Sequence, residues 1–142
     1  MSSVRGARRV YHRGVPQILP PILLLDDYPD TCEAVAVWLE MEGWKSVSCA
    51  SAESAIEVLS RERVAAIVME PHLRSGAAMH VARAARASPF GRPLLVSMSA
   101  SGREGDHTAY EPTLFDFNLV KPVPLDVLGR ILTRLRTTFG ER

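Results

Sequence analysis

The sequence predicts a single α/β domain built on one doubly wound, five-stranded parallel sheet with helices on both faces. From residue 22 onward, short apolar runs alternate with segments of helical periodicity, and this alternation occurs five times. The first run, Ile22–Leu25, is apolar at every position, as expected of a central strand that is covered on both faces. The chain of 142 residues is long enough to bury a core without disulfides or a structural metal.

The first half of the alternation supplies two strands and two helices. The first run leads into a helix that we expect to begin at Asp30, which forms a capping-box pattern with Glu33, and to stop at Gly43. A short strand is expected at 47–49. A second helix is expected over about 51–61, because apolar residues recur there at helical spacing.

The second half adds three strands and a closing helix. Strands are expected at 65–69, 94–98 and 117–120, with an alanine-rich helix at 77–87 between the first two of them. Between the last two strands, two glycines and a proline weaken the pattern of a further helix, whose presence we leave open. The closing helix follows Pro124 and carries an apolar face through four turns.

The pattern divides the chain into a basic arm at residues 1–19, one domain at 20–138 and a short tail at 139–142. Residues 1–25 hold four arginines and no acidic residue, so the rest of the chain is mildly acidic although the net charge of the whole is +1. The arm has neither helical nor strand periodicity. We therefore expect it to be a flexible, solvated segment.

No targeting or membrane-spanning segment is expected. The apolar stretch that contains the first strand is broken by Pro20 and Pro21 and closed by two aspartates, so neither a signal peptide nor a membrane span fits. Cys32 and Cys49 have neither zinc-ligand spacing nor the density of a disulfide framework. We expect two small buried residues in the reducing cytoplasm.

Four of the predicted strands end next to side chains that can carry chemistry: Asp26 and Asp27, Glu70, Ser99, and Lys121. Ala100 follows Ser99 at the same strand end. Because the loops at the carboxyl ends of parallel strands converge on one crevice, we expect three carboxylates, a hydroxyl and an ammonium to meet there. A simpler alternative for the acidic pair is that it caps the following helix. Lys121 is one of only two lysines in the chain and directly follows an apolar strand, where a solvated charge would be unusual.

This set of residues resembles the receiver domain of two-component response regulators, in the CheY-like superfamily. The segment ILLLDDYPD is similar to the first strand and acidic pair of that family, VSMSAS to its fourth strand with the switch hydroxyl at Ser99, and NLVKPV to its fifth strand with a Lys-Pro pair. The separations also suit the family, with 43 residues from Asp27 to Glu70, 29 from there to Ser99 and 22 from there to Lys121. The resemblance covers about residues 21–135 and implies the flavodoxin-like strand order 2-1-3-4-5.

The resemblance also implies a chemistry. In the family, an aspartate after the third strand receives a phosphoryl group from a histidine kinase, and an acidic pair, here Asp26 and Asp27, holds Mg²⁺. The equivalents of Ser99, Ala100 and Lys121 lie where the family contacts the phosphoryl group. The family's implied partners are a histidine kinase, a phosphotransfer protein or a downstream signalling protein, and a homodimer is left open.

The sequence departs from the family at the acceptor position, which is Glu70. No aspartate occurs between Asp30 and Asp106, so no other register restores one. Glutamate carries its carboxylate about 1.5 Å further into the crevice, and displacements of roughly 1 Å cost about a hundredfold in rate. Pro71 also lacks an amide hydrogen in a loop that is shorter than usual. We therefore expect little or no phosphotransfer, doubtful Mg²⁺ binding, and an ion pair between Glu70 and Lys121.

Two further positions have simple interpretations. Asn118 occupies the position at which the family has its switch aromatic, so an aromatic rotamer switch cannot operate there; as a residue on its own, it is an ordinary polar side chain near a strand start. His72 has the residue type of a ligand or a phosphoryl carrier, but a loop histidine beside Pro71 is more often exposed.

Other function classes fit less well. A Mg²⁺-dependent phosphohydrolase of the haloacid-dehalogenase type needs D-x-D, and Tyr28 stands where the second acid would fall. A nucleotide-binding enzyme needs a glycine-rich turn after the first strand. About six residues follow the last predicted helix, so we expect no DNA-binding output domain.

We therefore expect a stand-alone, degenerate receiver domain in two-component or phosphorelay signalling. It would act by protein contact rather than catalysis, with Glu70 imitating or bypassing the phosphorylated state. The alternative is a response regulator that is phosphorylated on a non-standard acceptor, either Glu70 or one of the acidic pair.

Overall fold

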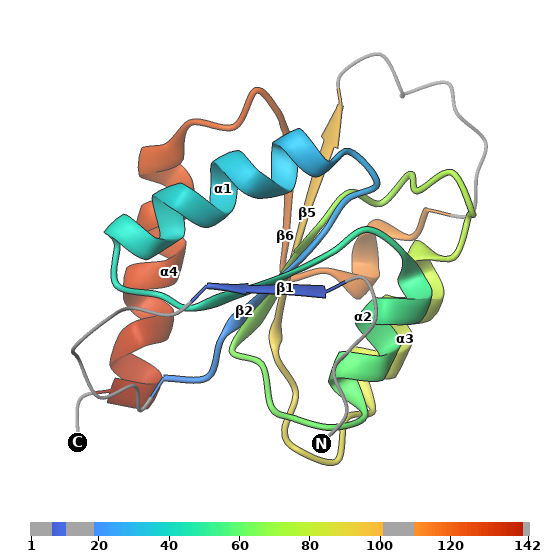
Figure 1. The fold of residues 1–142 in the computed structure, drawn as a ribbon, viewed down its shortest axis with the longest axis horizontal. Coiled ribbons are helices and arrows are strands. Elements are labelled where there is room, and N and C mark those ends of the chain that lie inside the picture. The colour runs from blue at the N-terminus through green and yellow to red at the C-terminus, as the bar shows by residue number, and fades with distance from the viewer. Residues whose placement is uncertain (1–6, 11–18, 101–109, 141–142) are drawn as a thin grey trace.

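The computed structural model describes residues 7–10, 19–100 and 110–140, and these contain one six-stranded sheet in the order β1-β3-β2-β4-β5-β6 (Figure 1). The strands are β1 (Ala7–Val10), β2 (Ile22–Leu25), β3 (Ser46–Cys49), β4 (Ala66–Met69), β5 (Leu94–Ala100) and β6 (Phe117–Lys121). The last five are parallel to one another and confirm the predicted order 2-1-3-4-5.

Four α-helices cover the two faces of the described sheet, with α1 (Pro29–Met41) and α4 (Leu125–Gly140) on one side and α2 (Ala52–Leu59) and α3 (Ala78–Arg86) on the other (Figure 1). A short 3₁₀ turn, η1 (Pro112–Leu114), precedes β6. The doubtful fourth helix of the sequence pattern falls mainly on residues 101–109, which lie outside the described part of the chain. In that part, no helix is long and apolar enough to cross a membrane.

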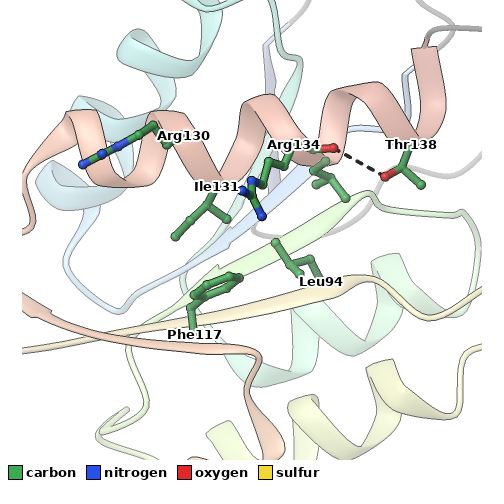
Figure 2. Close-up of a pocket in the computed structure, with 7 residues that line it drawn as sticks. Leu94, Phe117, Arg130, Ile131, Arg134 and Thr138 are labelled. Atoms are coloured by element: carbon green, nitrogen blue, oxygen red, sulfur yellow. Dashed lines mark hydrogen bonds between the residues drawn. The ribbon is translucent and has the colours of Figure 1, made fainter.

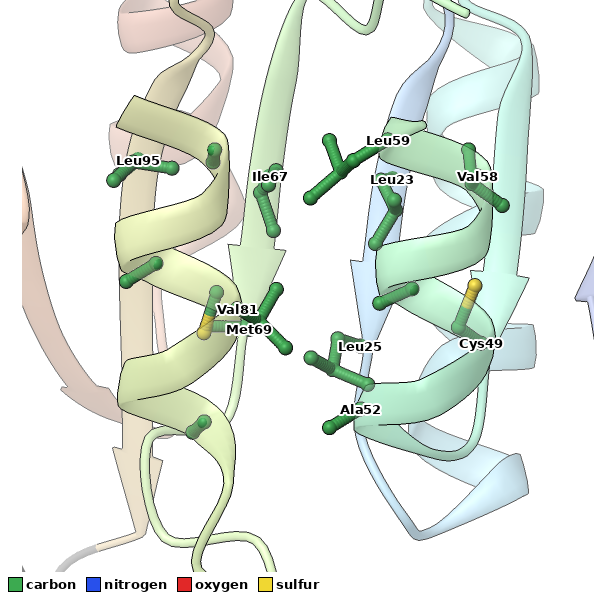
Figure 3. Close-up of a cluster of buried hydrophobic side chains, with 14 of the residues drawn as sticks. Leu23, Leu25, Cys49, Ala52, Val58, Leu59, Ile67, Met69, Val81 and Leu95 are labelled. Carbon is green, nitrogen blue, oxygen red and sulfur yellow. The ribbon is translucent and has the colours of Figure 1, made fainter. Parts of the chain in front are cut away.

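The core has two layers because side chains alternate across each strand. Leu23, Leu25, Ile67 and Met69 point towards α2 and α3, as Figure 3 shows, while the residues between them point towards α1 and α4. Every residue of β2 and β4 is buried, so the continuously apolar runs are central strands, as predicted. Both cysteines are free and buried, as expected.

The helix boundaries differ from the prediction at α1. The helix begins at Pro29 rather than Asp30, with Tyr28 as the N-cap residue and no side-chain cap, so the Asp30–Glu33 pattern is not a capping box here. The physical reason is that proline at the first helical position needs no amide partner. The backbone N–H of Tyr28 is instead bound by the Asp26 carboxylate at 2.9 Å.

Residues 7–10 also differ from the prediction of an arm without regular structure, because they form β1 and pair antiparallel with β3. Without β1, β3 would be an edge strand with unpaired backbone N–H and C=O groups. Residues 7–10 read Ala-Arg-Arg-Val and have no apolar run, which explains why the sequence pattern did not indicate a strand there.

Candidate functional site

The carboxyl ends of β2, β4 and β6 bring Asp26, Glu70 and Lys121 together. The backbone continues the sheet into the site, since the N–H of Asp26 donates to the carbonyl of Cys49 at 3.2 Å and the N–H of Glu70 donates to that of Leu25 at 2.9 Å. These backbone hydrogen bonds fix the positions of Asp26 and Glu70 at the ends of their strands. The convergence predicted from the strand ends is present for these three residues.

Lys121 is the centre of the cluster. Its Nζ lies 3.1 Å from Asp26 Oδ2 and 3.1 Å from Glu70 Oε1, so the predicted ion pair with Glu70 is present and a second one accompanies it. Burial would lower the pKa of Lys121, but the hydrogen bonds and charges of Asp26 and then Glu70 outweigh it and raise the pKa above its ordinary value. The ammonium is therefore held charged at neutral pH.

The remaining oxygens of the two acids are bound by backbone groups. Asp26 Oδ1 accepts the N–H of Tyr28, as described above, and Glu70 Oε2 accepts the N–H of His72 at 2.9 Å. The carboxyl group of Glu70 is thus held between a lysine and its own loop, and the residue is only 4% exposed. Asp26 both pairs with Lys121 and anchors the turn before α1, so the simpler interpretation of the pair, a role in shaping the helix start, is also partly right.

Asp27 does not join this cluster but binds the next loop. Its Oδ2 accepts the backbone N–H of Arg74 at 2.9 Å and the Nε of the same arginine at 3.2 Å. Burial would raise the pKa of Asp27, but these hydrogen bonds and the guanidinium charge lower it below its ordinary value. Sequence reasoning missed Arg74, because nothing in an exposed loop arginine indicates a partner 47 residues earlier.

His72 is buried, with 6% of its surface exposed, so the prediction of an exposed loop histidine was wrong. Its ring packs edge-on against the ring of Tyr110, with centroids 5.3 Å apart. Tyr110 follows the part of the chain that is not described, and sequence spacing gave no sign that it would cover this loop. The burial follows from that aromatic contact, which shields the imidazole from water.

Ser99 and Ala100 lie at the carboxyl end of β5, where their register partners on β6 are Val120 and Lys121. Both are half-buried, and Ala100 lies opposite Lys121 in the sheet register. Asn118 lies deeper along β6, and its Oδ1 accepts the hydroxyl of the fully buried Ser97 at 2.8 Å. The hydroxyl of Tyr110 also donates a hydrogen bond to Asn118. Position 118 therefore makes polar contacts, whereas the family is expected to have an aromatic side chain there.

A small cavity borders the two buried acids on the side of α1. This cavity of about 10 Å³, about the size of one water molecule, lies between β2, β4 and α1 and is lined by Asp26, Glu70 and Cys32 among others. Burial, and then the charge of Asp26, raises the pKa of the Cys32 thiol to about 11. This thiol is therefore neutral and unreactive at physiological pH.

The arrangement does not fit Mg²⁺ as it stands. Mg²⁺ requires near-octahedral oxygen ligands, usually including one or two carboxylates. Here one oxygen of Asp26 and one of Glu70 bind the Lys121 ammonium, and Asp27 binds Arg74. Among the described side chains, no group of three or more potential ligands is placed to hold a metal. Asp26 and Asp27 would have to leave their cations before they could bind one.

An open, mainly parallel α/β sheet with buried acids and a lysine at its carboxyl edge defines the class of protein: a flavodoxin-like domain whose site lies at the strand ends. No protein-family model and no curated protein matches the chain. Its solved structural neighbours are response regulator receiver domains of the CheY-like type, and the chain has their fold.

Three neighbours show the extent of the similarity. A receiver domain from Methylobacillus flagellatus is 26% identical and aligns over 82% of this chain and 98% of its own, with a TM-score of 0.70. A sensor protein from Polaromonas sp. JS666 is 29% identical over 84% of this chain and 97% of its own, with a TM-score of 0.69.

The third neighbour is the receiver domain of a sensor histidine kinase from Pseudomonas aeruginosa PAO1, described with magnesium coordinated in its active-site cleft. It is 25% identical over 82% of this chain and 97% of its own, with a TM-score of 0.66. The receiver fold supports a role in two-component signalling, and Mg²⁺ is compatible with that fold.

Proposed function

We propose that this protein is a degenerate receiver domain that takes part in two-component signalling by protein contact, with Glu70 in place of the phosphoacceptor aspartate. The observation that carries the proposal is the position of Lys121, which lies 3.1 Å from both Glu70 and Asp26. Lys121 is thus already paired with the carboxylate that would have to act as the phosphoacceptor. Catalysis is not part of this proposal.

The geometry of Glu70 also disfavours phosphorylation. A nucleophilic carboxylate oxygen needs an open approach, with the reacting atoms aligned about 3–3.5 Å apart. Glu70 uses one oxygen for Lys121 and the other for the N–H of His72. Both candidate acceptor atoms are therefore occupied by donors of the same chain.

The test is incubation of the protein with acetyl phosphate and Mg²⁺, followed by intact-mass measurement, alongside a receiver domain that has the usual aspartate. We expect the control to gain a phosphoryl group and this protein to gain none. A phosphoryl adduct that Glu70→Ala abolishes would establish the alternative, a regulator phosphorylated on glutamate. An adduct that persists in Glu70→Ala but disappears in Asp26→Asn or Asp27→Asn would assign it to the acidic pair.

Partner binding tests the signalling part of the proposal. Histidine kinases, phosphotransfer proteins and downstream signalling proteins are the expected partners, and their affinity is measured for the parent, Glu70→Asp and Glu70→Gln. Because aspartate is shorter by about 1.5 Å, it loses contact with Lys121, whereas glutamine keeps the length but loses the charge. We expect both variants to bind the partner more weakly than the parent if Glu70 holds the signalling state, and equal affinities would contradict that role.

A further inference from the structure

We propose that Arg74 is a positioning residue which, together with Lys121, holds the three carboxylates of the site in the place of a divalent cation. The inference goes beyond the proposed function, because it concerns how the acidic cluster keeps its geometry rather than what it signals. It assigns a role to the β4–α3 loop, which contains Arg74. It also assigns separate carboxylates to each cation.

The two cations divide the acids between them. Lys121 comes from the end of β6 and binds Asp26 and Glu70, while Arg74 comes from the loop after β4 and binds Asp27. Together they supply two positive charges against three negative ones.

Burial makes such compensation necessary. The side chains of Asp26 and Glu70 are 6% and 4% exposed and that of Asp27 is 13% exposed. Buried carboxylates in one crevice repel one another unless cations or donors face them. Lys121 Nζ lies 3.1 Å from Asp26 and from Glu70, and Arg74 Nε lies 3.2 Å from Asp27, so each of the three carboxylates has a cation in contact.

Arg74 contacts Asp27 through both its backbone and its side chain. Its backbone N–H and its Nε both donate to the same oxygen of Asp27, so the contact fixes the loop backbone as well as the side chain. The guanidinium also lies 5.7 Å from the centre of the Tyr28 ring. The loop is thereby joined to the turn before α1 across the mouth of the site.

The two cations differ in exposure, and this makes Arg74 the one to test. The side chain of Arg74 is 74% exposed and that of Lys121 is 25% exposed. Replacing an exposed arginine leaves the core intact, so Arg74→Gln is expected to fold normally. It removes the charge and the Nε contact while the backbone N–H of residue 74 remains.

The experiment is calorimetric titration with Mn²⁺, used as the probe for Mg²⁺, on the full chain. We expect Arg74→Gln to bind Mn²⁺ about tenfold more tightly than the parent, since Asp27 is released and one repelling charge is lost. Arg74→Lys keeps the charge and is expected to bind Mn²⁺ as weakly as the parent. The matched control is Arg61→Gln, an exposed arginine on the opposite side of the sheet from α1 that pairs with Glu57, and it is expected to have no effect.

A second readout follows the loop itself. Amide hydrogen exchange around residues 72–76 is expected to be faster in Arg74→Gln than in the parent when no metal is present, and to slow again with Mn²⁺. Equal Mn²⁺ affinities in the parent and in Arg74→Gln would overturn the inference, as would tight Mg²⁺ binding by the parent. That failure is distinct from failure of the proposed function, which is decided by the phosphoryl adduct and not by metal affinity.

Discussion

At the scale of single residues, the site depends on one ammonium group that serves two buried acids. Lys121 holds both Asp26 and Glu70, whereas neither acid has another charged partner among the contacts described for these residues. A buried charge that loses its partner costs far more than an exposed ion pair contributes. The stability of the site is therefore concentrated in one side chain.

We expect Lys121→Met to lower the free energy of unfolding by about 3 kcal/mol at neutral pH, because it leaves two like charges in the interior. Urea unfolding of the parent and the variant measures this loss. The only other lysine gives the control, Lys45→Met, and a loss as large as that of Lys121→Met would contradict the assignment.

Some residues of the site could be predicted from the sequence and others could not. The residues at the strand ends could be predicted, because periodicity locates the ends and parallel strands bring them together. Arg74 and the burial of His72 could not, since each depends on a tertiary contact with a distant residue, Asp27 for one and Tyr110 for the other. Side chains that come together only through loop conformation leave no period in a sequence.

At the scale of elements, the packing of α4 on α1 contains a replaceable glycine. Gly129 lies within α4, and a Cβ added there would meet the Trp38 ring at 3.5 Å, which is an ordinary contact distance. Glycine inside a helix costs about 0.5–1 kcal/mol relative to alanine. A methyl group therefore fits at position 129, and alanine there would favour the helix more than glycine does.

We expect Gly129→Ala to raise the free energy of unfolding by about 0.5–1 kcal/mol, as measured by urea denaturation. The control is Gly91→Ala, which places alanine at a φ of 110° and is expected to destabilise the protein. A loss of stability in Gly129→Ala would mean that α4 and α1 pack more closely than described.

Elements were predictable where side-chain periodicity defined them. The five parallel strands and the helices α1 to α3 lie within about two residues of their expected bounds, because their apolar faces are buried as the pattern requires. α4 extends to Gly140, beyond the predicted end near residue 137, and Phe139 packs against the core layer beneath it. β1 was not predicted at all, because its sequence, Ala-Arg-Arg-Val, lacks the apolar run that indicated the other strands.

At the scale of the whole molecule, two groups favour the protonated state more strongly after folding. The pKa of Cys32 rises from 9.0 to about 11 through burial, and the pKa of Lys121 rises above 10.5 through its acidic partners. The folded protein therefore holds more protons than the unfolded chain in alkaline solution. It follows that stability is retained below about pH 9 and is lost as the pH rises above it.

We expect the free energy of unfolding to fall between pH 9 and about 11, with Cys32 contributing at most about 3 kcal/mol of the loss. Urea unfolding curves across this range measure it. Cys32→Ala should reduce the slope in this window and leave the part due to Lys121. A slope that is unchanged in Cys32→Ala would show that the thiol does not contribute.

The contact between the last strand and the first loop also bears on how the chain folds during synthesis. Lys121 lies 95 residues after Asp26 and 51 after Glu70, so both acids leave the ribosome long before their counter-ion does. Until β6 arrives, a nascent sheet would enclose two anions with no cation beside them. We therefore expect the amino-terminal two thirds to remain loosely ordered and the native state to form only when the carboxyl-terminal segment completes the charge balance.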